Sequence, residues 1–589
     1  MRLIFTKDLP KNTKGSYIHF YNIIIDSNSW TPIENKQYIN KNIESWQSQL
    51  VSWHDQVCQI GQKIYDDWWF TEASRLTAWQ PKINKSLFFT VSMIQICEDL
   101  TIDEIYIVKA PKEVEILTRD VHPDWDIISE NQRYTKKSSI SAFRSILSSY
   151  KSIITMLIRS FKLFSPLAKD LSDIELIIFS NLIDFDSFQS SGDHYFGNMF
   201  DEINDVKNEK KLWIFLSELG SRNEEITILS SIRSKSYRAY ILQDLLTLSD
   251  AAIILLRIGA FYLFSQRFKT KIPIISIDGM KFTSFSLLFY NETIKNKPPI
   301  IAFQTKYAFK AIVSKVSTAS LFYPFEDKGI ERAILSQSRN LYTIGYAHAI
   351  HNSGHLFLKE KKLEEAAPQW PNLIGCSGKA AAHWLANKKE INLDRLVTIG
   401  SNRYVNIIEK TKFTHNGILR ILVLTGQNYE ITMLANYVEQ NATIFNNCEL
   451  TVRLYPYDYH EEPNEGIIRL KRLISNVKVL DGPLLKQIDD CDIVIYASTS
   501  AGIEAMLLGR ICVYVDMHHI VPLNCLESKG DVSSLFTANT PDELKEVLKK
   551  IESMTLNEYN DHVTKSHDFA ISLYAPVNKN KLRSLILDV

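Results

Sequence analysis

The feature that most constrains the fold lies near the C-terminal end, where two apolar runs flank a helical pattern between positions 492 and 516. The first run, Ile493–Tyr496, is too short for a helix and consists of strand-forming residues. A turn of small residues at 498–500 then opens the helical pattern, which ends at Gly509 before the second run. This order predicts a strand–helix–strand unit of a parallel sheet.

The same alternation begins at about residue 418 and continues through the C-terminal part of the chain. Apolar runs predict strands at Ile418–Leu424, Glu449–Leu454 and Val477–Leu480. Helical patterns separate them at about 428–441 and 484–491. We therefore expect a doubly wound parallel sheet, in which ligands bind beyond the carboxyl ends of the strands.

The turn after the strand at 493–496 has the chemistry of an anion site. Ser498, Thr499 and Ser500 place hydroxyls and backbone N–H groups at the positive end of the predicted helix. Such an arrangement binds a phosphate without a lysine. The alternative is an ordinary N-cap, which uses the same residue types.

Composition and charge bound the class of protein. With 589 residues the chain exceeds a single hydrophobic core, and we predict two domains, at 1–385 and 386–589. The 67 basic and 67 acidic residues cancel, which argues against a general nucleic-acid binder. Seven scattered cysteines without a CxxC pair argue against a disulfide framework or a structural zinc site and favour a cytoplasmic protein.

The N-terminal half is less regular. Strands are expected at Tyr17–Ile25, Ile102–Val108, Ile174–Ile183, Ile312–Tyr323 and Tyr342–Ala347. Long helices are expected at about 45–66 and 236–266, with a shorter one at Arg332–Asn340. The segment Lys359–Leu373 is charged and contains two prolines, which is typical of a connector.

A basic amphipathic segment spans 131–169. It contains no acidic residue, and apolar residues recur in it at helical spacing from Phe143 to Phe164. An apolar face beside a purely basic polar face is typical of a helix on an anionic membrane surface. The alternative is a core helix with a solvated basic face.

Two α/β domains with a phosphate-receptive turn in the second are consistent with a GT-B glycosyltransferase architecture, in which two Rossmann-type domains face a cleft. The stretches 326–333 (EDKGIERA), 344–348 (IGYAH) and 192–197 (GDHYFG) resemble motifs of bacterial surface-carbohydrate biosynthesis proteins of GT-B type. In that group a Glu-x-x-Gly-Trp-Glu segment precedes a Gly-x-x-His strand end. Here Ile330 stands in place of the Trp.

The C-terminal half is similar to bacterial sialyltransferases and Kdo transferases, which use CMP-activated sugars. Those enzymes place a His-Pro pair and a Ser-Ser/Thr motif around the donor phosphate. The matching residues are Arg453, Tyr455 and Pro456, with Tyr455 at the position of the His, and the turn at 498–500. A phenol can still donate one hydrogen bond to a phosphate oxygen.

The resemblance and the chemistry together suggest the site residues. An inverting transfer needs a general base on the N-terminal domain, for which Glu326 is the first candidate, followed by Asp327 and Glu331. Glu331 has the alternative role of an ordinary first-turn helix residue. Asp278-Gly279 is a weaker candidate, since this pair usually forms a turn.

The remaining candidates are expected around the donor and in the cleft. His348 would contact donor or acceptor, and the resemblance places Glu504 on a sugar or ribose hydroxyl. The predicted donor-binding residues are Arg403, Gly426, Arg453, Tyr455, Ser498, Thr499, Ser500 and Glu504. No metal site is expected, because the histidines at 348, 351 and 355 lack carboxylate or thiolate partners at suitable spacing.

These inferences predict an inverting, metal-independent glycosyltransferase without a cofactor. Its donor would be a nucleotide sugar, CMP-linked nonulosonic acid or Kdo, and its acceptor a surface glycan or lipid-linked glycan. It would work in the cytoplasm, peripherally on the inner face of the plasma membrane, and bind no nucleic acid. The alternatives are a sugar-nucleotide epimerase, a polyol-phosphate transferase, or a non-catalytic membrane-associated assembly protein.

Overall fold

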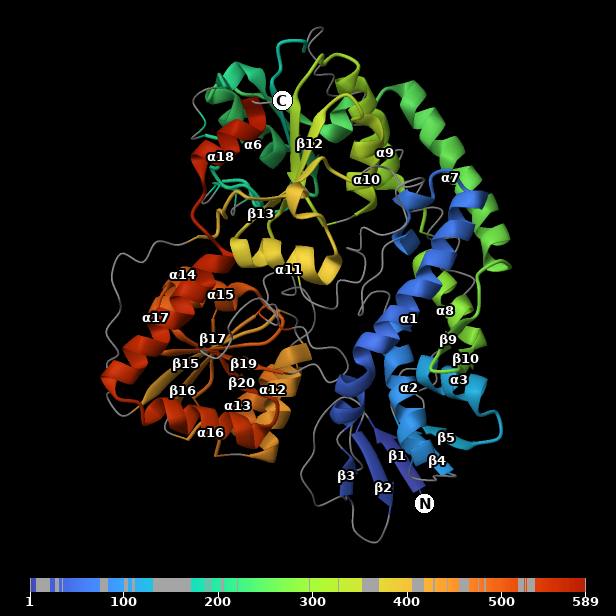
Figure 1. Cartoon of the computed structure of the whole chain (residues 1–589), viewed down its shortest axis with the longest axis vertical. Coiled ribbons are helices and arrows are strands. Elements are labelled where there is room, and N and C mark those ends of the chain that lie inside the picture. The colour runs from blue at the N-terminus through green and yellow to red at the C-terminus, as the bar shows by residue number, and fades with distance from the viewer. Residues whose placement is uncertain are drawn as a thin grey trace.

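A computed structural model shows an α/β protein with three sheets of five or more strands (Figure 1). It describes residues 2–6, 22–26, 31–33, 35–74, 83–99, 104–108, 112–130, 171–351, 370–404, 418–454, 465–516, 524, 526 and 535–587. Within these ranges the positions 186–187, 190–191, 202, 204–205, 220, 296, 327, 427–428, 442, 447, 475 and 481–483 are not described.

The central sheet has seven parallel strands in the order β14-β13-β12-β11-β6-β7-β8. The strands are β6 (Leu176–Leu182), β7 (Lys211–Ser217), β8 (Arg238–Ile241), β11 (Ser320–Pro324), β12 (Tyr342–Ala347), β13 (Leu373–Cys376) and β14 (Leu396–Thr398). Most of their residues are buried, as expected for a parallel sheet covered on both faces. The chain order reverses between β6 and β11, which makes their junction the switch point of this sheet.

Helices cover both faces of the central sheet. They include α6 (Arg222–Ser234), α9 (Ile300–Val313), α10 (Gly329–Gln337) and α11 (Lys379–Lys389). In contrast, α7 (Leu248–Lys269) packs on the outer side of α9, and α8 (Thr283–Thr293) lies away from this sheet (Figure 1). A capping box at Thr247 and Asp250 starts α7. Between α7 and α8 lies a short hairpin of β9 (Ile275–Ile277) and β10 (Met280–Phe282).

The C-terminal sheet has six parallel strands in the order β17-β16-β15-β18-β19-β20. The strands are β15 (Leu419–Leu424), β16 (Cys448–Arg453), β17 (Lys478–Leu480), β18 (Ile493–Tyr496), β19 (Ile511–Val515) and β20 (Phe536–Ala538). The helices are α12 (Tyr429–Gln440), α13 (Glu465–Leu473), α14 (Leu484–Asp489), α15 (Ala501–Leu507), α16 (Pro541–Glu552) and α17 (Leu556–Leu573). This is the strand order of a Rossmann-type domain, with its switch point between β15 and β18.

The N-terminal unit is a five-stranded mixed sheet with its own helices, at the lower right of Figure 1. Its strands are β1 (Arg2–Thr6), β2 (Asn22–Asp26), β3 (Thr31–Ile33), β4 (Glu104–Val108) and β5 (Asp126–Glu130). Its helices are α1 (Asn35–Ile64), α2 (Ile83–Asp99) and α3 (Lys112–Val121). Trp53 of α1 and Trp68 of the turn after it pack in the same core as α7 and α8, so both tryptophans have a structural role.

The chain returns to the central sheet at its end. After α17, residues 574–578 run alongside the ends of β13 and β14, where Ser401 N–H donates to Ala575 O at 2.8 Å and Asn578 N–H donates to Ile399 O at 2.9 Å. The last helix, α18 (Lys579–Leu587), then buries Leu582 and Ile586 against the face of the central sheet that includes Phe322. This return ties the two Rossmann-type sheets together.

The predicted α/β class with two Rossmann-type sheets is confirmed, as is the alternation after residue 418. Two predictions in the N-terminal half are wrong. The expected helix at 236–266 is β8 followed by α7, and the expected strand at 312–323 begins within α9. The predicted boundary at 385/386 falls inside α11, and the basic segment 131–169 lies outside the described residues.

Candidate active site

The carboxyl ends of the central strands bring together polar residues from distant parts of the sequence. Because the strands are parallel, the loops after β6, β11, β12 and β14 all leave from the same edge of the sheet. These loops carry the residues that we call the central-edge cluster: His194, Tyr195, Glu326, Lys328, His348 and Arg403. The cluster therefore lies at the position where open α/β sheets bind ligands.

Glu326 is held by its own loop. Its backbone N–H donates to both carboxylate oxygens of Glu331, at 3.0 Å each, and Glu331 is buried in the first turn of α10. The side chain of Glu326 pairs with Lys328 and keeps partial contact with solvent. Glu331 thus supports the loop, whereas Glu326 presents its carboxylate at the edge of the sheet.

Position 329, in the motif 326–333, has room only for a glycine. A Cβ at this position would lie 2.4 Å from the carbonyl oxygen of Phe70, in the turn after α1. Arg332 adds a second contact between α10 and this turn, since its Nη1 donates to Ser74 Oγ at 2.9 Å. The N-terminal unit therefore buttresses the loop that carries Glu326.

His348 follows β12 and is buried beside Glu326. Its Nε2 lies 3.7 Å from Glu326 Oε1, and its ring contacts Tyr195 edge-on with the centroids 4.6 Å apart. Burial lowers the pKa of His348 to about 3, and the nearby Glu326 carboxylate offsets this only in part. The imidazole is therefore neutral at neutral pH. Its Nδ1 is buried without a hydrogen-bond partner among the described residues, and a bound ligand would satisfy this atom.

His194 is a site residue that the sequence analysis missed. Its pKa is lowered by burial and by Arg403, while Glu326 raises it in part, so all three groups lie within electrostatic reach of one another. Its ring contacts Tyr195 edge-on at 5.0 Å. The available signal was its place in the segment 192–197, whose resemblance to a motif was noted without assigning a role to the histidine.

The switch point of the C-terminal sheet holds the predicted anion site together with an unexpected carboxylate. Gly426 follows β15 and Ser498 follows β18. Glu430, fully buried in α12, accepts a hydrogen bond from Gly426 N–H at 2.7 Å and one from the Ser498 hydroxyl. Glu430 thus orients this turn and occupies two of its hydrogen-bond donors.

Arg403 joins the central-edge cluster to the C-terminal sheet. Its Nη1 donates to Ser500 Oγ at 3.0 Å and lies 3.9 Å from Glu504 Oε1. Burial raises the pKa of Glu504, while Arg403 and Arg453 lower it, which places both guanidinium groups near this carboxylate. The structure therefore brings together Arg403, Arg453, Ser500 and Glu504 beside the predicted phosphate turn.

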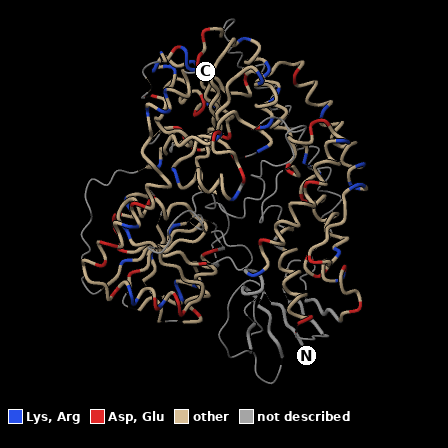
Figure 2. Tube along the Cα trace, viewed as in Figure 1, with Lys and Arg blue, Asp and Glu red and all other residues tan. Residues whose placement is uncertain are grey.

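Thr499 makes a local contact, since its Oγ1 accepts a hydrogen bond from Ala501 N–H at 3.2 Å at the start of α15. Asp327 and Tyr455 lie outside the described residues. Among the side chains that are described, no group of three or more His, Cys, Asp or Glu is placed to hold a metal ion. Basic and acidic residues are interspersed over the described chain (Figure 2).

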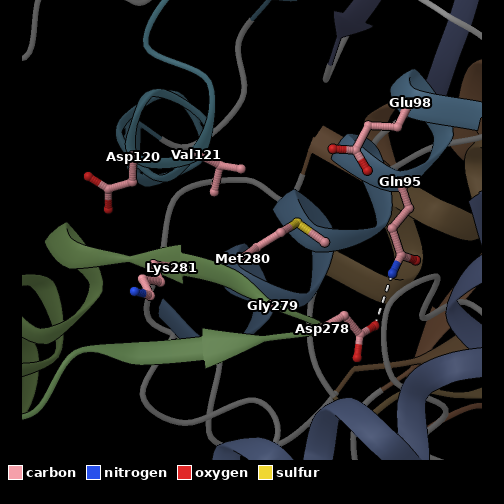
Figure 3. A pocket seen from close by; sticks show the side chains of 8 residues that line it. All are labelled: Gln95, Glu98, Asp120, Val121, Asp278, Gly279, Met280 and Lys281. Carbon is pink, nitrogen blue, oxygen red and sulfur yellow. Dashed lines mark hydrogen bonds between the residues drawn. The ribbon is translucent and has the colours of Figure 1, made fainter.

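The weaker candidate Asp278-Gly279 lies elsewhere, at the tip of the hairpin of β9 and β10 (Figure 3). Both residues have positive φ, at 49° and 84°, as a two-residue hairpin turn requires. The Asp278 carboxylate accepts hydrogen bonds from Trp46 Nε1 at 2.6 Å and from the amides of Gln49 and Gln95. A surface pocket borders this turn, but none of the other predicted site residues lines it, and Asp278 acts there as a structural anchor.

Asp193, next to His194, gives a prediction for the pH dependence of stability. Burial raises its pKa from 3.8 to about 6, although Ser180 and two backbone N–H groups oppose the shift. Between these values the folded chain keeps a proton that the unfolded chain releases, so the contribution of Asp193 to stability is full below about pH 4 and is lost as the pH rises through about 6. The shift corresponds to roughly 3 kcal/mol. We expect Asp193→Asn, which keeps an oxygen acceptor for the N–H groups of Tyr195 and Phe196, to remove this loss.

The measurement is the Tm of wild type and Asp193→Asn at about pH 4 and about pH 7. The variant should gain on the wild type as the pH rises, because other titrating groups cancel in the comparison. A Tm difference that does not change with pH would show that Asp193 does not titrate in this window.

Comparisons with known proteins place this geometry in context. No family model and no curated protein sequence matches the chain. Among solved structures, the trehalose-6-phosphate phosphatase N-terminal domain of Candida albicans is similar over 72% of this chain and 98% of its own, with 10% identity and a TM-score of 0.43. TarM is similar over 70% of this chain and 98% of its own, with 13% identity and a TM-score of 0.40.

The UDP-GlcNAc 2-epimerase from Neisseria meningitidis, bound to UDP-GlcNAc, is similar over 70% of this chain and 100% of its own, with 11% identity and a TM-score of 0.40. Since these TM-scores lie below 0.5, the assignment of the fold rests on the strand orders of the two parallel sheets. The chain has a GT-B-like α/β fold, built from two Rossmann-type sheets with polar clusters at both switch points.

Proposed function

We propose that this chain is an inverting, metal-independent glycosyltransferase that moves a sugar from a nucleotide donor to a hydroxyl group of a surface glycan or lipid-linked glycan. The observation that carries the proposal is the contact of Arg403 with Ser500 and Glu504. Arg403 belongs to the central-edge cluster, as does the Glu326 carboxylate, which is suited to proton abstraction. Its contacts would therefore make Glu326 and the phosphate turn at 498–500 parts of one site.

In the proposed reaction, the oxygen of the acceptor hydroxyl attacks the anomeric carbon of the donor, while Glu326 accepts the proton of that hydroxyl. The bond from this carbon to the donor phosphate breaks, and the nucleotide leaves with the electron pair. Arg403 and Arg453 would stabilise the negative charge on the departing phosphate, together with the Ser500 hydroxyl. His348 and His194 would contact the reacting sugar or the acceptor.

The proposed donor is a CMP-linked nonulosonic acid or Kdo, from the resemblance to sialyltransferases and Kdo transferases. Donor affinities in the micromolar to millimolar range correspond to about 4–8 kcal/mol. A helix start supplies at most about 2 kcal/mol. Charge-assisted hydrogen bonds from arginines would therefore contribute a large part of donor binding.

The test is calorimetric or thermal-shift binding of CMP, CDP, UDP and GDP to the purified full chain. We expect selective stabilisation by CMP and a loss of at least tenfold in affinity in Arg453→Ala, Thr499→Ala and Ser500→Ala. A single charge-assisted hydrogen bond contributes about 1.5–3 kcal/mol, which is tenfold or more. Arg472→Ala is the matched control, because Arg472 is exposed on α13, in the same sheet unit.

Each outcome is informative. Preferential binding of UDP or GDP would keep a nucleotide-sugar enzyme but overturn the CMP donor, and turnover of a UDP-sugar without an acceptor would indicate an epimerase. Binding of a CDP-polyol would indicate a polyol-phosphate transferase. Failure of every nucleotide to bind would overturn the proposal in favour of a non-catalytic assembly protein at the membrane.

A further inference from the structure

The helix α7 has one face in the protein core. Phe261, Phe264 and Phe268 are buried in the same cluster as Tyr65 and Trp68, and Tyr65 stacks on Phe264 with the ring centroids 4.7 Å apart. Figure 1 shows α7 running along the outer edge of the molecule. By length and composition it is the one helix of the described residues that could cross a membrane. Its buried face, however, packs along its length against the protein core.

The opposite face of α7 is apolar and exposed. Leu256 and Leu263 are 75% and 74% exposed, the highest values among the large apolar residues that the structure describes. Leu248 and Ile253 extend the same stripe, and a Cβ added to Gly259 would meet no atom within 4 Å. Only 33% of the most apolar window of this helix is buried, although its mean hydropathy is 1.6. A core helix of this composition would be buried on most sides.

Apart from the capping residue Asp250 in its first turn, all the charged residues of this helix are basic. From position 251 to 277 the sequence contains no acidic residue. Arg257 is paired with Asp67 at 3.0 Å, while Arg267, Lys269 and Lys271 are exposed at the C-terminal end of the apolar stripe. An apolar stripe that ends in basic side chains matches the acyl and headgroup layers of an anionic lipid surface.

A second copy of the chain fits this face less well. The 22 residues of α7 span about 33 Å, so a stripe about 10 Å wide offers roughly 330 Å² on each partner. The total of roughly 700 Å² is below the approximately 1,200 Å² of stable interfaces. A lipid surface needs no matching partner face.

We propose that the exposed face of α7 lies flat on an anionic lipid surface, with Leu256 and Leu263 in the acyl boundary and the basic end at the headgroups. This inference does not depend on the transferase reaction. It is also separate from the predicted membrane contact of the basic segment 131–169, which the following variants leave unchanged.

The test is co-sedimentation of the full chain with phosphatidylcholine vesicles, with and without phosphatidylglycerol. We expect binding to the mixed vesicles and a loss of at least tenfold in the partition coefficient of Leu256→Ser/Leu263→Ser. Removing Arg267, Lys269 and Lys271 should cost up to about fivefold per residue, and less at high salt. Leu393→Ser/Leu556→Ser is the matched control, since both leucines are more than half exposed outside α7 and should leave binding unchanged.

Three outcomes would overturn the proposal. The wild type could fail to bind either vesicle, or Leu256→Ser/Leu263→Ser could bind as the wild type does, which would place any membrane contact elsewhere in the chain. Alternatively, sedimentation velocity could show a wild-type dimer that this variant converts to a monomer while vesicle binding stays the same, which would assign the face to a second copy. Circular dichroism of the variants should match the wild type, because the substituted side chains are exposed.

Discussion

Glu326→Gln is expected to lower the rate of sugar transfer by about 10²–10⁴-fold, while nucleotide binding and the Tm stay close to those of the wild type. The magnitude is that of a lost general base. Glutamine has nearly the shape of glutamate but cannot take the acceptor proton. The loop should persist, because the hydrogen bonds that hold it run from the backbone N–H of Glu326 to Glu331 rather than from the substituted carboxylate.

A matched control separates the loss of a base from the loss of a surface ion pair. Glu175 also pairs with a lysine, Lys210, and is in partial contact with solvent, but it lies before the amino end of β6, away from the carboxyl edge. Glu175→Gln should therefore transfer sugar at the wild-type rate. The measurement is kcat and KM for transfer with the donor that the binding experiment identifies.

The division of the effect between kcat and KM distinguishes the possible roles. A base used only in the transition state lowers kcat with KM nearly constant, whereas a residue that only binds the acceptor raises KM. A Glu326→Gln enzyme with wild-type kcat would exclude Glu326 as the base. The next candidates at this edge would then be His194 and His348, since burial lowers the pKa of both imidazoles and keeps them neutral.

The C-terminal sheet could be predicted closely from the sequence because its strands are short, apolar and regularly separated by helices. The predicted strand at 493–496 coincides with β18, and the predicted anion turn directly precedes α15. In such a sheet the local pattern and the tertiary environment agree, since parallel strands are buried on both faces. The place of the turn at 498–500 could therefore be predicted from the sequence, while its role in phosphate binding stays a prediction.

Elsewhere the pattern and the environment disagree. The helix α9 ends at Val313, and a loop separates it from β11, which begins at Ser320. From periodicity alone, this helix end and loop cannot be distinguished from the start of a long strand. Glu430 was missed because a glutamate at the start of a predicted helix has a sufficient local explanation in the helix dipole. Its contacts with Gly426 and Ser498 depend on the pairing of β15 with β18, which the sequence does not display.

Arg403 shows how much of the site depends on tertiary structure. The sequence analysis predicted it as a donor-binding residue, but could not predict its contact with Ser500, which lies 97 positions further along the chain. That contact requires the loop after β14 to turn at Gly400, where the returning segment before α18 crosses.

Gly400→Ala is expected to destabilise the protein by about 3 kcal/mol and to weaken nucleotide binding. Gly400 has a φ of +92°, and a Cβ there would lie 2.3 Å from Pro576 O and 2.6 Å from Val577 Cα. A side chain in this backbone conformation costs about 1–2 kcal/mol. Forcing the two segments apart costs a further 1–3 kcal/mol or so. It would also strain the flanking hydrogen bonds of Ser401 and Asn578 and displace Arg403.

Substitutions at two other glycines separate the cost of the backbone conformation from the cost of the steric overlap. Gly279 has a φ of +84° with no atom near its added Cβ, so Gly279→Ala should show the backbone cost alone. Gly259 lies in the middle of α7 in open space, so Gly259→Ala should stabilise the helix by about 0.5–1 kcal/mol. Thermal unfolding should therefore rank Gly400→Ala lowest, followed by Gly279→Ala, the wild type and Gly259→Ala. If Gly400→Ala matched Gly279→Ala and bound nucleotide normally, the crossing segment would not hold Arg403 in place, and the two sheets would form the site without it.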